Sequence, residues 1–471
     1  MKKLSSLLLL LALSICWSYA QQAKYVFYFI GDGMGVNQVQ GTEIYRAELE
    51  GKMGITPLLF TQFPYSTVAI TNSATNRVTD SAAAGTALAT GRKTKNSAIG
   101  VLKDQETPIN SVAVWAKNKG CRVGIATSVT VNHATPGAFY AHAAKRTLYH
   151  EIGKDLYKTG FDFYAGSDFR DATDKNNPTT DNLYEMAGKN GYTIARGYKD
   201  YLKQSKKADK MLLLQTEEAS KREFVAIPYA IDRKKGEMTL QDITRSAINF
   251  LSKDLSKGFF LMVEGGKIDW ACHSNDAATT FHEIIDFDNA IKIAYEFYSQ
   301  HPDETLIVVT ADHETGGFVL GTGTYDLNLQ VLKNQKVSEN GFTRIVNKMR
   351  AKTSNQVSWE AIREALKDNF WDKIELTAEQ EARLKTVHEK SLMHQEMKLE
   401  KSEYAQDEPI ASEAKRIINE IALVGWTSGG HSAGYVPVFA IGAGADLFQG
   451  RIDNTEIPIK IAQAAGYPID F

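Results

Sequence analysis

The hydrophobic positions of this chain gather in short runs that alternate with longer helical patterns. Short apolar runs rich in β-branched or aromatic residues predict buried strands. Such runs lie at Tyr25–Ile30, Val123–Ala126, Phe259–Val263, Leu306–Thr310 and Tyr435–Ile441. The patterns of Ser111–Asn118 and Ala277–Tyr298 favour helices. This alternation predicts an α/β fold with a mainly parallel central sheet flanked by helices.

The pattern changes between about Tyr325 and Ala422, where the chain becomes charged and helix-prone. The run "ELTAEQEARLKTVHEKSLMHQEMKLEKSE" is typical of this segment. Charges on such helices usually form a solvated face. We therefore expect one domain over residues 21–471, with a helical insertion at about 325–422 that lies over the sheet as a lid or crown.

The first twenty residues have the layout of a secretory signal peptide, with Lys2 and Lys3 before an apolar run and "SYA" before a cut after Ala20. The run is too short for a membrane span. We expect residues 1–20 to be removed and the protein to be exported, either to the periplasm or outside the cell. Lipoprotein processing at Cys16 ranks second, because Ile15 is a poor residue before such a cysteine.

Composition narrows the classes of function. The 471 residues are 43% hydrophobic and 23% charged, with a formal net charge of -2, which is ordinary for a globular protein. The absence of a basic excess argues against a nucleic-acid-binding module. No other stretch is long and apolar enough for a transmembrane segment. Once Cys16 is removed, Cys121 and Cys272 allow one disulfide but not a disulfide scaffold.

Polar side chains follow four of the predicted strands. In an open α/β sheet, ligands bind beyond the carboxyl ends of the strands, so these side chains are expected to face one crevice. They are Asp32 after the first strand, His133 and Thr135 after the second, Glu264 after the third, and Asp312 and His313 after the fourth.

Each motif has a plainer interpretation when taken alone. The Gly-Asp-Gly of "IGDGMG" is a common turn. Asp269 and His273 are four residues apart and share a helix face, as a surface pair also would. Asp312 and His313 can both reach a metal, or can be a capping Asp beside a hydrogen-bonded His. His431 lies in a glycine-rich loop, where a lone histidine usually has no special role.

Together, three histidines and four carboxylates at strand exits suffice for two zinc sites and a harder, oxygen-lined site. The stretch "VTDSAAAGTALATGRKTKNS" adds Ser81 at a helix start. Thr, Asp and Ser there can simply cap the helix. Alternatively, Ser81 is a nucleophile stabilised by a metal and the helix dipole.

Seven segments in the same order resemble the alkaline phosphatase family and span Tyr25 to Ala445: "FIGDGMG", "VTDSAAAGTALATGRKTKN", "HATPGAF", "AHAAKR", "VEGGKIDWACH", "VTADHETGG" and "GGHSAGYVPV". The resemblance implies a catalytic domain that hydrolyses phosphate monoesters to an alcohol and inorganic phosphate through a phosphoserine. It also implies open, promiscuous substrate binding, and homodimers are common in the family.

The resemblance further implies a role for each matching residue. Ser81 matches the nucleophile. Arg146 matches the arginine that clamps phosphate, and Asp80 matches the neighbour that orients this arginine rather than serving as a spare cap. The implied ligands are Asp269, His273 and His431 for one Zn²⁺, Asp32, Asp312 and His313 for a second Zn²⁺, and Asp32, Thr135 and Glu264 for Mg²⁺.

Two residues depart from the best-known bacterial member. His133 stands where that member has an acid, so the third site can favour Mg²⁺, Zn²⁺ or Co²⁺. Trp270 stands where that member has a lysine, and it can modulate the third site or simply pack over the cleft. Cys272, between two ligands, is either a thiol near zinc or, with greater weight, a buried structural cysteine.

Other functions fit the residues less well. A sulfatase needs Pro and Arg in its modification signal, and "DSAAAG" lacks both. A phosphodiesterase has no use for a clamp on two non-bridging oxygens, so Arg146 argues against it. A protein that only binds phosphate needs no nucleophile, so Ser81 argues against it.

Overall fold

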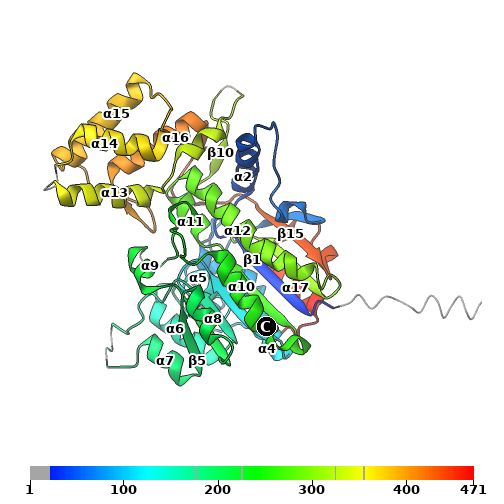
Figure 1. Cartoon of the computed structure of the whole chain (residues 1–471). Coiled ribbons are helices and arrows are strands. Elements are labelled where there is room, and N and C mark those ends of the chain that lie inside the picture. Colours follow the sequence, from blue (N-terminus) through cyan, green and yellow to red (C-terminus); the bar gives the residue numbers. More distant parts are fainter. Residues whose placement is uncertain (1–21, 176, 178, 224–225, 324, 354–355) are drawn as a thin grey trace, which may run out of the picture.

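A ten-stranded sheet forms the centre of this computed structural model (Figure 1). The described residues are 22–471, apart from 176, 178, 224–225, 324 and 354–355. The predicted signal peptide, with Cys16, lies outside them. The order of the strands is β16 (Ile452–Asp453), β2 (Tyr65–Ile70), β15 (Val436–Gly442), β8 (Thr305–Thr310), β1 (Tyr25–Ile30), β7 (Phe259–Glu264), β3 (Arg122–Thr127), β4 (Phe163–Gly166), β6 (Lys210–Leu214) and β5 (Tyr192–Arg196).

Parallel pairing dominates this sheet and confirms the predicted architecture. Strand β15 is antiparallel to both β2 and β8, and the other recorded pairings within the sheet are parallel. The five predicted strands correspond to β1, β3, β7, β8 and β15 to within a residue at each end. All six residues of β1 are buried, as expected for a strand covered on both faces.

Helices cover both faces of the sheet. The helices of this part are α2 (Val36–Leu49), α3 (Ser81–Thr90), α4 (Val112–Asn118), α5 (Ala134–Gly137), α6 (Tyr149–Thr159), α7 (Leu183–Lys189), α8 (Tyr198–Gln204), α9 (Glu217–Arg222), α10 (Leu240–Leu251), α11 (Lys267–His273), α12 (Ala277–Tyr298) and α17 (Glu456–Ala465). On one face of the sheet, α10 packs against β3, β7 and α12, and α12 packs against β8. The other face is covered by a group of helices that contact one another and strands β1, β3 and β7, namely α3, α4, α5 and α17.

The charged segment forms a lobe beside α2 and α12, coloured yellow to orange in Figure 1. Its helices are α13 (Glu339–Lys352), α14 (Trp359–Leu366), α15 (Ala378–His388) and α16 (Pro409–Ala422). The lobe is not only a solvated face, because Phe342 and Ile417 belong to a buried cluster that also holds Tyr45 of α2 and Phe281 of α12. It lies between β10 (Phe318–Leu320) and β13 (Val424–Trp426), which pair antiparallel.

The prediction of helix for the charged run "ELTAEQEARLKTVHEKSLMHQEMKLEKSE" is correct only for its first part. Helix α15 continues as a wider helical turn over Glu389–Met393, and the helix then ends. Beyond it, β11 (Glu400–Lys401) and β12 (Gln406–Asp407) pair antiparallel as a short hairpin. Charged, helix-prone composition therefore did not reveal this hairpin. Within the described residues, no helix has the length and apolarity needed to cross a membrane.

Candidate active site

The carboxyl ends of the central strands lie level with one another and bring the predicted residues together. Ile30 of β1 pairs with Glu264 of β7 and Thr310 of β8, and Thr127 of β3 also pairs with Glu264. Strand β15 runs the other way, so its beginning lies at this edge. That direction carries His431, which precedes β15, to the same place.

His431 does not lie in a free loop as the glycine-rich sequence suggested. It begins β14 (His431–Ser432), which pairs antiparallel with β9 (Glu314–Thr315) directly after the His313 position. The His431 and His313 rings stack with their centroids 3.6 Å apart. The backbone pairing thus holds two of the predicted ligands side by side.

The loop after β1 packs closely against α11. Gly33 has φ 72°, and a Cβ atom there would lie 2.8 Å from the Cα of Asp269. Its backbone N–H donates to Asp312 Oδ1 at 3.1 Å. A glycine is therefore required at this turn, both for its backbone conformation and for the close approach of α11.

The first cluster of candidate metal ligands is Asp269, His273 and His431. Asp269 and His273 share a face of α11, with Asp269 Oδ2 3.3 Å from His273 Nε2, as their spacing predicted. His273 Nδ1 donates to the Gly429 carbonyl at 2.6 Å, and His431 Nδ1 donates to the Thr79 carbonyl at 2.8 Å. These bonds turn both Nε2 atoms toward each other, 3.2 Å apart, in the orientation a shared cation needs.

The second cluster is Asp32, Asp312 and His313. His313 Nε2 lies 3.3 Å from Asp32 Oδ1 and 3.4 Å from Asp312 Oδ2. Its other nitrogen, Nδ1, is 3.1 Å from Thr315 Oγ1, which donates to Asp269 Oδ1 at 2.6 Å. Thr315 thus links the first two clusters, a role for which the sequence carried no signal.

The third cluster is Asp32, His133 and Glu264. His133 therefore approaches this site directly, together with the carboxylates. Its Nε2 accepts from Arg146 Nη2 at 3.4 Å, which leaves its buried Nδ1 without a hydrogen-bond partner among the described residues. Thr135 Oγ1 and Glu264 Oε1 are also buried and have no hydrogen-bond partner among the residues that the structure describes.

The three clusters bring buried carboxylates close together, an arrangement that bound cations would stabilise. Burial, and then the nearby Asp312, Asp269 and Glu264 carboxylates, raise the pKa of Asp32. Burial raises the pKa of Glu264 to about 8 and that of Asp312 to about 6. Both oxygens of Asp32, with Asp269 Oδ2 and Asp312 Oδ2, have no hydrogen-bond partner among the described residues. Buried charge of this kind is normally paired or coordinates a metal, so the donor set fits divalent cations.

The histidines of the site are held in different states. Burial acts to raise the pKa of Asp269, but His273, His431 and His313 outweigh it and hold that pKa well below its usual range. Burial acts to lower the pKa of His273, yet Asp269 brings it to about 9. Burial, followed by His431, lowers the pKa of His313. A neutral His313 is the form that binds metal.

Ser81 is the first residue of α3, as predicted, and is fully buried. Its Oγ lies 3.2 Å from His313 Nε2 and so faces the second cluster. All ten residues of α3 are buried, and a Cβ at Gly85 would approach the Thr135 Cα to 3.2 Å. The run of small residues therefore allows α3 to pack closely against α5, which carries Thr135.

Asp80 both caps helix α3 and contacts Arg146. The expectation that it does not serve as a helix cap is therefore wrong. Asp80 is the N-cap of α3, and its Oδ1 accepts from the Ala83 N–H at 3.0 Å. Its Oδ2 also lies 3.5 Å from Arg146 Nη1. Because a carboxylate has two oxygens and about four lone-pair directions, it can cap and pair together.

Sequence reasoning missed the residues that the lobe contributes. Tyr404, between β11 and β12, accepts from Arg146 Nη2 at 3.0 Å and stacks on Trp270 with ring centroids 4.6 Å apart. Glu403 Oε2 lies 3.5 Å from His273 Nε2. Tyr404 is 258 positions from Arg146, so no local pattern could connect them. Trp270 thus packs over the site, beside His133.

Cys121 and Cys272, the two cysteines among the described residues, are both free. Cys272 is buried, with its Sγ 3.7 Å from Thr280 Oγ1, and burial raises the pKa of its thiol. It belongs to none of the three ligand clusters found among the described residues. The interpretation as a structural cysteine is the one that agrees with these contacts.

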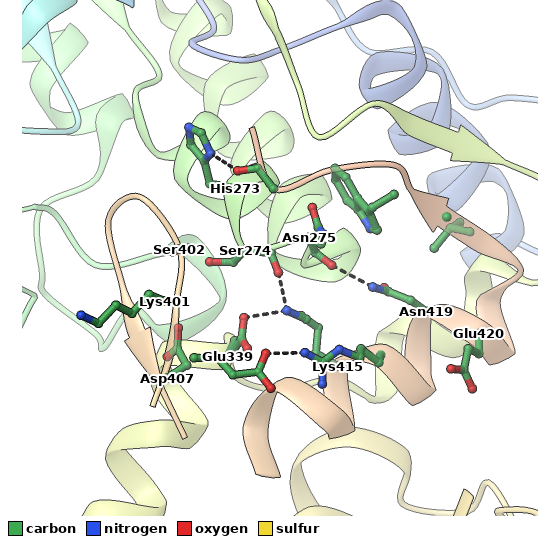
Figure 2. Close-up of a pocket in the computed structure, with 16 residues that line it drawn as sticks. His273, Ser274, Asn275, Glu339, Lys401, Ser402, Asp407, Lys415, Asn419 and Glu420 are labelled. Carbon is green, nitrogen blue, oxygen red and sulfur yellow. Dashed lines mark hydrogen bonds and ion pairs between the residues drawn. The ribbon is translucent and has the colours of Figure 1, made fainter. Parts of the chain in front are cut away.

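A polar cavity of about 430 Å³ lies between the hairpin and α16, beside His273 (Figure 2). Lys415 and Glu339 both line it, with Lys415 Nζ 2.9 Å from Glu339 Oε2. The Ser402 side chain lines it from the hairpin and the Asn419 side chain from α16. The hairpin therefore lines this cavity on one side and contacts residues of the candidate active site on the other.

Comparison with known proteins agrees with this geometry. Alkaline phosphatase 3 of Bacillus subtilis (strain 168) is 33% identical over 459 residues, covering 95% of this chain and 90% of that protein. A cold-active alkaline phosphatase from the psychrophile Shewanella sp. matches in structure with TM-score 0.77 and 31% identity, covering 94% of this chain and 99% of the other. A mutant of TAB5 alkaline phosphatase with Mg bound in its M3 site matches with TM-score 0.64 and 28% identity, covering 95% and 99%.

The agreement extends to the model of a whole family. The model described as alkaline phosphatase matches residues 23–160 and 162–467, which include the serine, the arginine and all three ligand clusters. On that match, and on the similarity to a relative that shares a third of its residues over nearly its full length, this chain belongs to the alkaline phosphatase family.

Proposed function

We propose that this protein is a metal-dependent alkaline phosphatase that hydrolyses phosphate monoesters to an alcohol and inorganic phosphate. The observation that carries the proposal is the buried Ser81 Oγ, which starts a helix and faces the histidine and carboxylate clusters. A nucleophile at that position has the helix N-terminus beside it, and Arg146 lies 3.5 Å from the carboxylate of the preceding residue, Asp80. Membership of the family supports the same reaction.

The clusters suggest which residues hold which cation. We assign one Zn²⁺ to Asp269, His273 and His431, a second Zn²⁺ to Asp32, Asp312 and His313, and a Mg²⁺-type ion to Asp32, Glu264 and Thr135, with His133 beside it. When bound, such ions offset the charge of the phosphate and lower the pKa of coordinated oxygens. Mixed nitrogen and oxygen donors suit zinc, and oxygen donors suit magnesium.

The chain's own residues then divide the work. Ser81 Oγ releases its proton to solvent and forms a bond to phosphorus as the ester P–O bond breaks, and the departing alkoxide takes up a proton from solvent. A water molecule next attacks the phosphoserine, the Oγ–P bond breaks to release inorganic phosphate, and a proton from the water returns to Ser81 Oγ. Arg146 offers a planar fork that can bind two non-bridging oxygens throughout. Two in-line displacements give retention of configuration at phosphorus.

The reaction class can be tested by one assay. Hydrolysis rates for a phosphate monoester, a phosphate diester and a sulfate ester would be measured with and without a chelator. We expect the monoester to be hydrolysed fastest and its rate to fall on chelation. A preference for the diester or the sulfate ester would overturn the proposed substrate class, and full activity after verified metal removal would overturn the metal-dependent scheme.

Arg146→Ala should slow monoester hydrolysis more than diester hydrolysis. A monoester offers the arginine non-bridging oxygens with higher charge, and lost charge-assisted hydrogen bonds should lower kcat/KM about a hundredfold. For the diester we expect a loss of about tenfold or less. Steady-state kinetics on both substrates, with inorganic phosphate as inhibitor, would measure this. Equal losses on the two substrates would contradict the clamp.

His133→Asp should shift the metal preference of the third site toward Mg²⁺. A carboxylate is a harder ligand than imidazole, and Mg²⁺ prefers oxygen donors. Metal content after equilibration with mixed Mg²⁺, Zn²⁺ and Co²⁺ would measure the change. His394→Asp, at an exposed histidine of the lobe, is the control. An unchanged preference would mean that His133 only packs.

Three broader features complete the proposal. Residues 21–471 form one catalytic domain, and the segment at about 325–422 is an insertion whose hairpin borders the site. The charged start and short apolar run of residues 1–20 support export. Family habit supports a homodimer, which light scattering of the purified protein would test.

A further inference from the structure

The hairpin of β11 and β12 brings one aromatic residue, Tyr404, onto the phosphate side of the site. Its hydroxyl accepts from Arg146 Nη2 at 3.0 Å. Its ring lies nearly parallel to that of Trp270, at 11°, and edge-on to His133, with centroids 5.8 Å apart. Tyr404 is therefore fixed from two sides, by a stack and by a hydrogen bond.

Arg146 has few other partners to set its orientation. Its Nη1 reaches Asp80 Oδ2 only at 3.5 Å, and its Nη2 reaches His133 Nε2 at 3.4 Å. The bond to Tyr404 is the shortest side-chain contact recorded for this guanidinium among the described residues. Arginine has five N–H donors in a rigid plane, so a partner on one edge fixes where the remaining donors point.

We propose that Tyr404 is a positioning residue that sets the orientation of Arg146 toward phosphate, and that the helical lobe thereby determines phosphate affinity. This inference rests on the proposed function, because it assigns Arg146 to the phosphate. Asp80 lies against Nη1 and Tyr404 against Nη2, so the plane of the guanidinium is held at both terminal nitrogens before substrate arrives. Preorganisation of this kind lowers the cost of binding.

The stack on Trp270 makes Tyr404→Phe a clean test. Phenylalanine keeps the ring, so packing against Trp270 is retained and only the hydroxyl is lost. We expect the inhibition constant of inorganic phosphate to rise about 5- to 20-fold, the loss of one charge-assisted hydrogen bond. The KM for a monoester should rise in parallel, while kcat stays the same or increases. A purely structural role would instead lower kcat and thermal stability together.

A double-mutant cycle with Arg146→Ala makes the inference sharper. If Tyr404 acts through Arg146, Tyr404→Phe should change the phosphate inhibition constant in the parent enzyme but not in the Arg146→Ala background. Tyr325→Phe, at a fully exposed tyrosine of the same lobe, is the matched control and should behave as the parent. Matching circular dichroism and metal content would verify that each variant is folded and loaded.

The possible outcomes separate this inference from the proposed function. Equal effects of Tyr404→Phe in both backgrounds, or no effect in either, would overturn the positioning role even in an active phosphatase. A metal-loaded parent enzyme that does not hydrolyse monoesters would overturn the proposed function itself. Coupling between the two positions in an active enzyme is the result that supports both.

Discussion

Replacing Ser81 with alanine should lower kcat for a phosphate monoester by at least about a thousandfold while the bound metal content stays the same. The serine oxygen is the atom that forms the covalent bond, and the helix N-terminus and histidine around it cannot replace it. The three clusters are formed by histidine and carboxylate side chains, so removal of the Ser81 hydroxyl leaves all of these side chains in place. Activity should therefore fall while the amount of bound metal stays the same.

Ser81 lies at the start of a helix, so a control must show that loss of a serine at a helix start does not by itself lower kcat. Ser358 is the exposed N-cap of helix α14, and its side chain accepts from the Ala361 N–H. Ser358→Ala should cost about 1 kcal/mol of stability and leave kcat unchanged. Mass spectrometry of acid-quenched turnover mixtures would detect phosphate on the parent protein at Ser81. Normal turnover by Ser81→Ala would remove Ser81 from its assigned role.

The parts of the site that could be predicted from the sequence depend on local order along the chain. Buried parallel strands read as continuous apolar runs, so β1, β7 and β8 were recognised, and their carboxyl ends had to share one edge. The Asp269 and His273 pair followed from helical spacing alone. These predictions needed no knowledge of how distant segments pack.

The parts that could not be predicted depend on contacts between distant segments. The family resemblance implied His431 as a ligand, but no local pattern did, because His431 reaches the site only through β15 being antiparallel within a mostly parallel sheet, and an apolar run does not reveal strand direction. Tyr404 lies in a segment whose composition favours helix, yet it sits on a hairpin over Arg146. The double use of Asp80 likewise required the geometry of both its oxygens.

Removal of the metals should abolish activity and destabilise the protein, increasingly so as pH rises from about 6.5 to 8. In the metal-free chain, burial raises the pKa of Glu264 to about 8, and Asp269 raises that of His273 to about 9 against the effect of burial. Over this interval each group holds, in the folded state, a proton that the unfolded chain releases. Stability therefore falls with rising pH, by up to about 1.4 kcal/mol per pH unit for each group.

The metal-loaded protein should not show this fall, because its ligands are already deprotonated and neutralised by the cations. Burial lowers the pKa of His133 and of His313, so these rings are neutral in the folded protein both with and without metal and cancel in the comparison of the two forms. The gap in Tm between loaded and chelated protein, measured by calorimetry at pH 6.5, 7.25 and 8, should widen steadily. Zinc and magnesium added back should restore both Tm and turnover.

Other buried acids titrate in the same pH interval. The quantity to compare across pH is therefore the difference in Tm between the metal-loaded and the chelated protein. Burial raises the pKa of Glu283 and of Asp407 to about 7, and neither belongs to a ligand cluster. Their contributions are the same in loaded and chelated protein and cancel in the Tm gap. Glu264→Gln removes one of the two responsible groups, so it should flatten the pH dependence of the chelated protein while weakening the third site. A Tm gap that stays constant or narrows with pH would contradict the assignment of these buried acids as metal ligands.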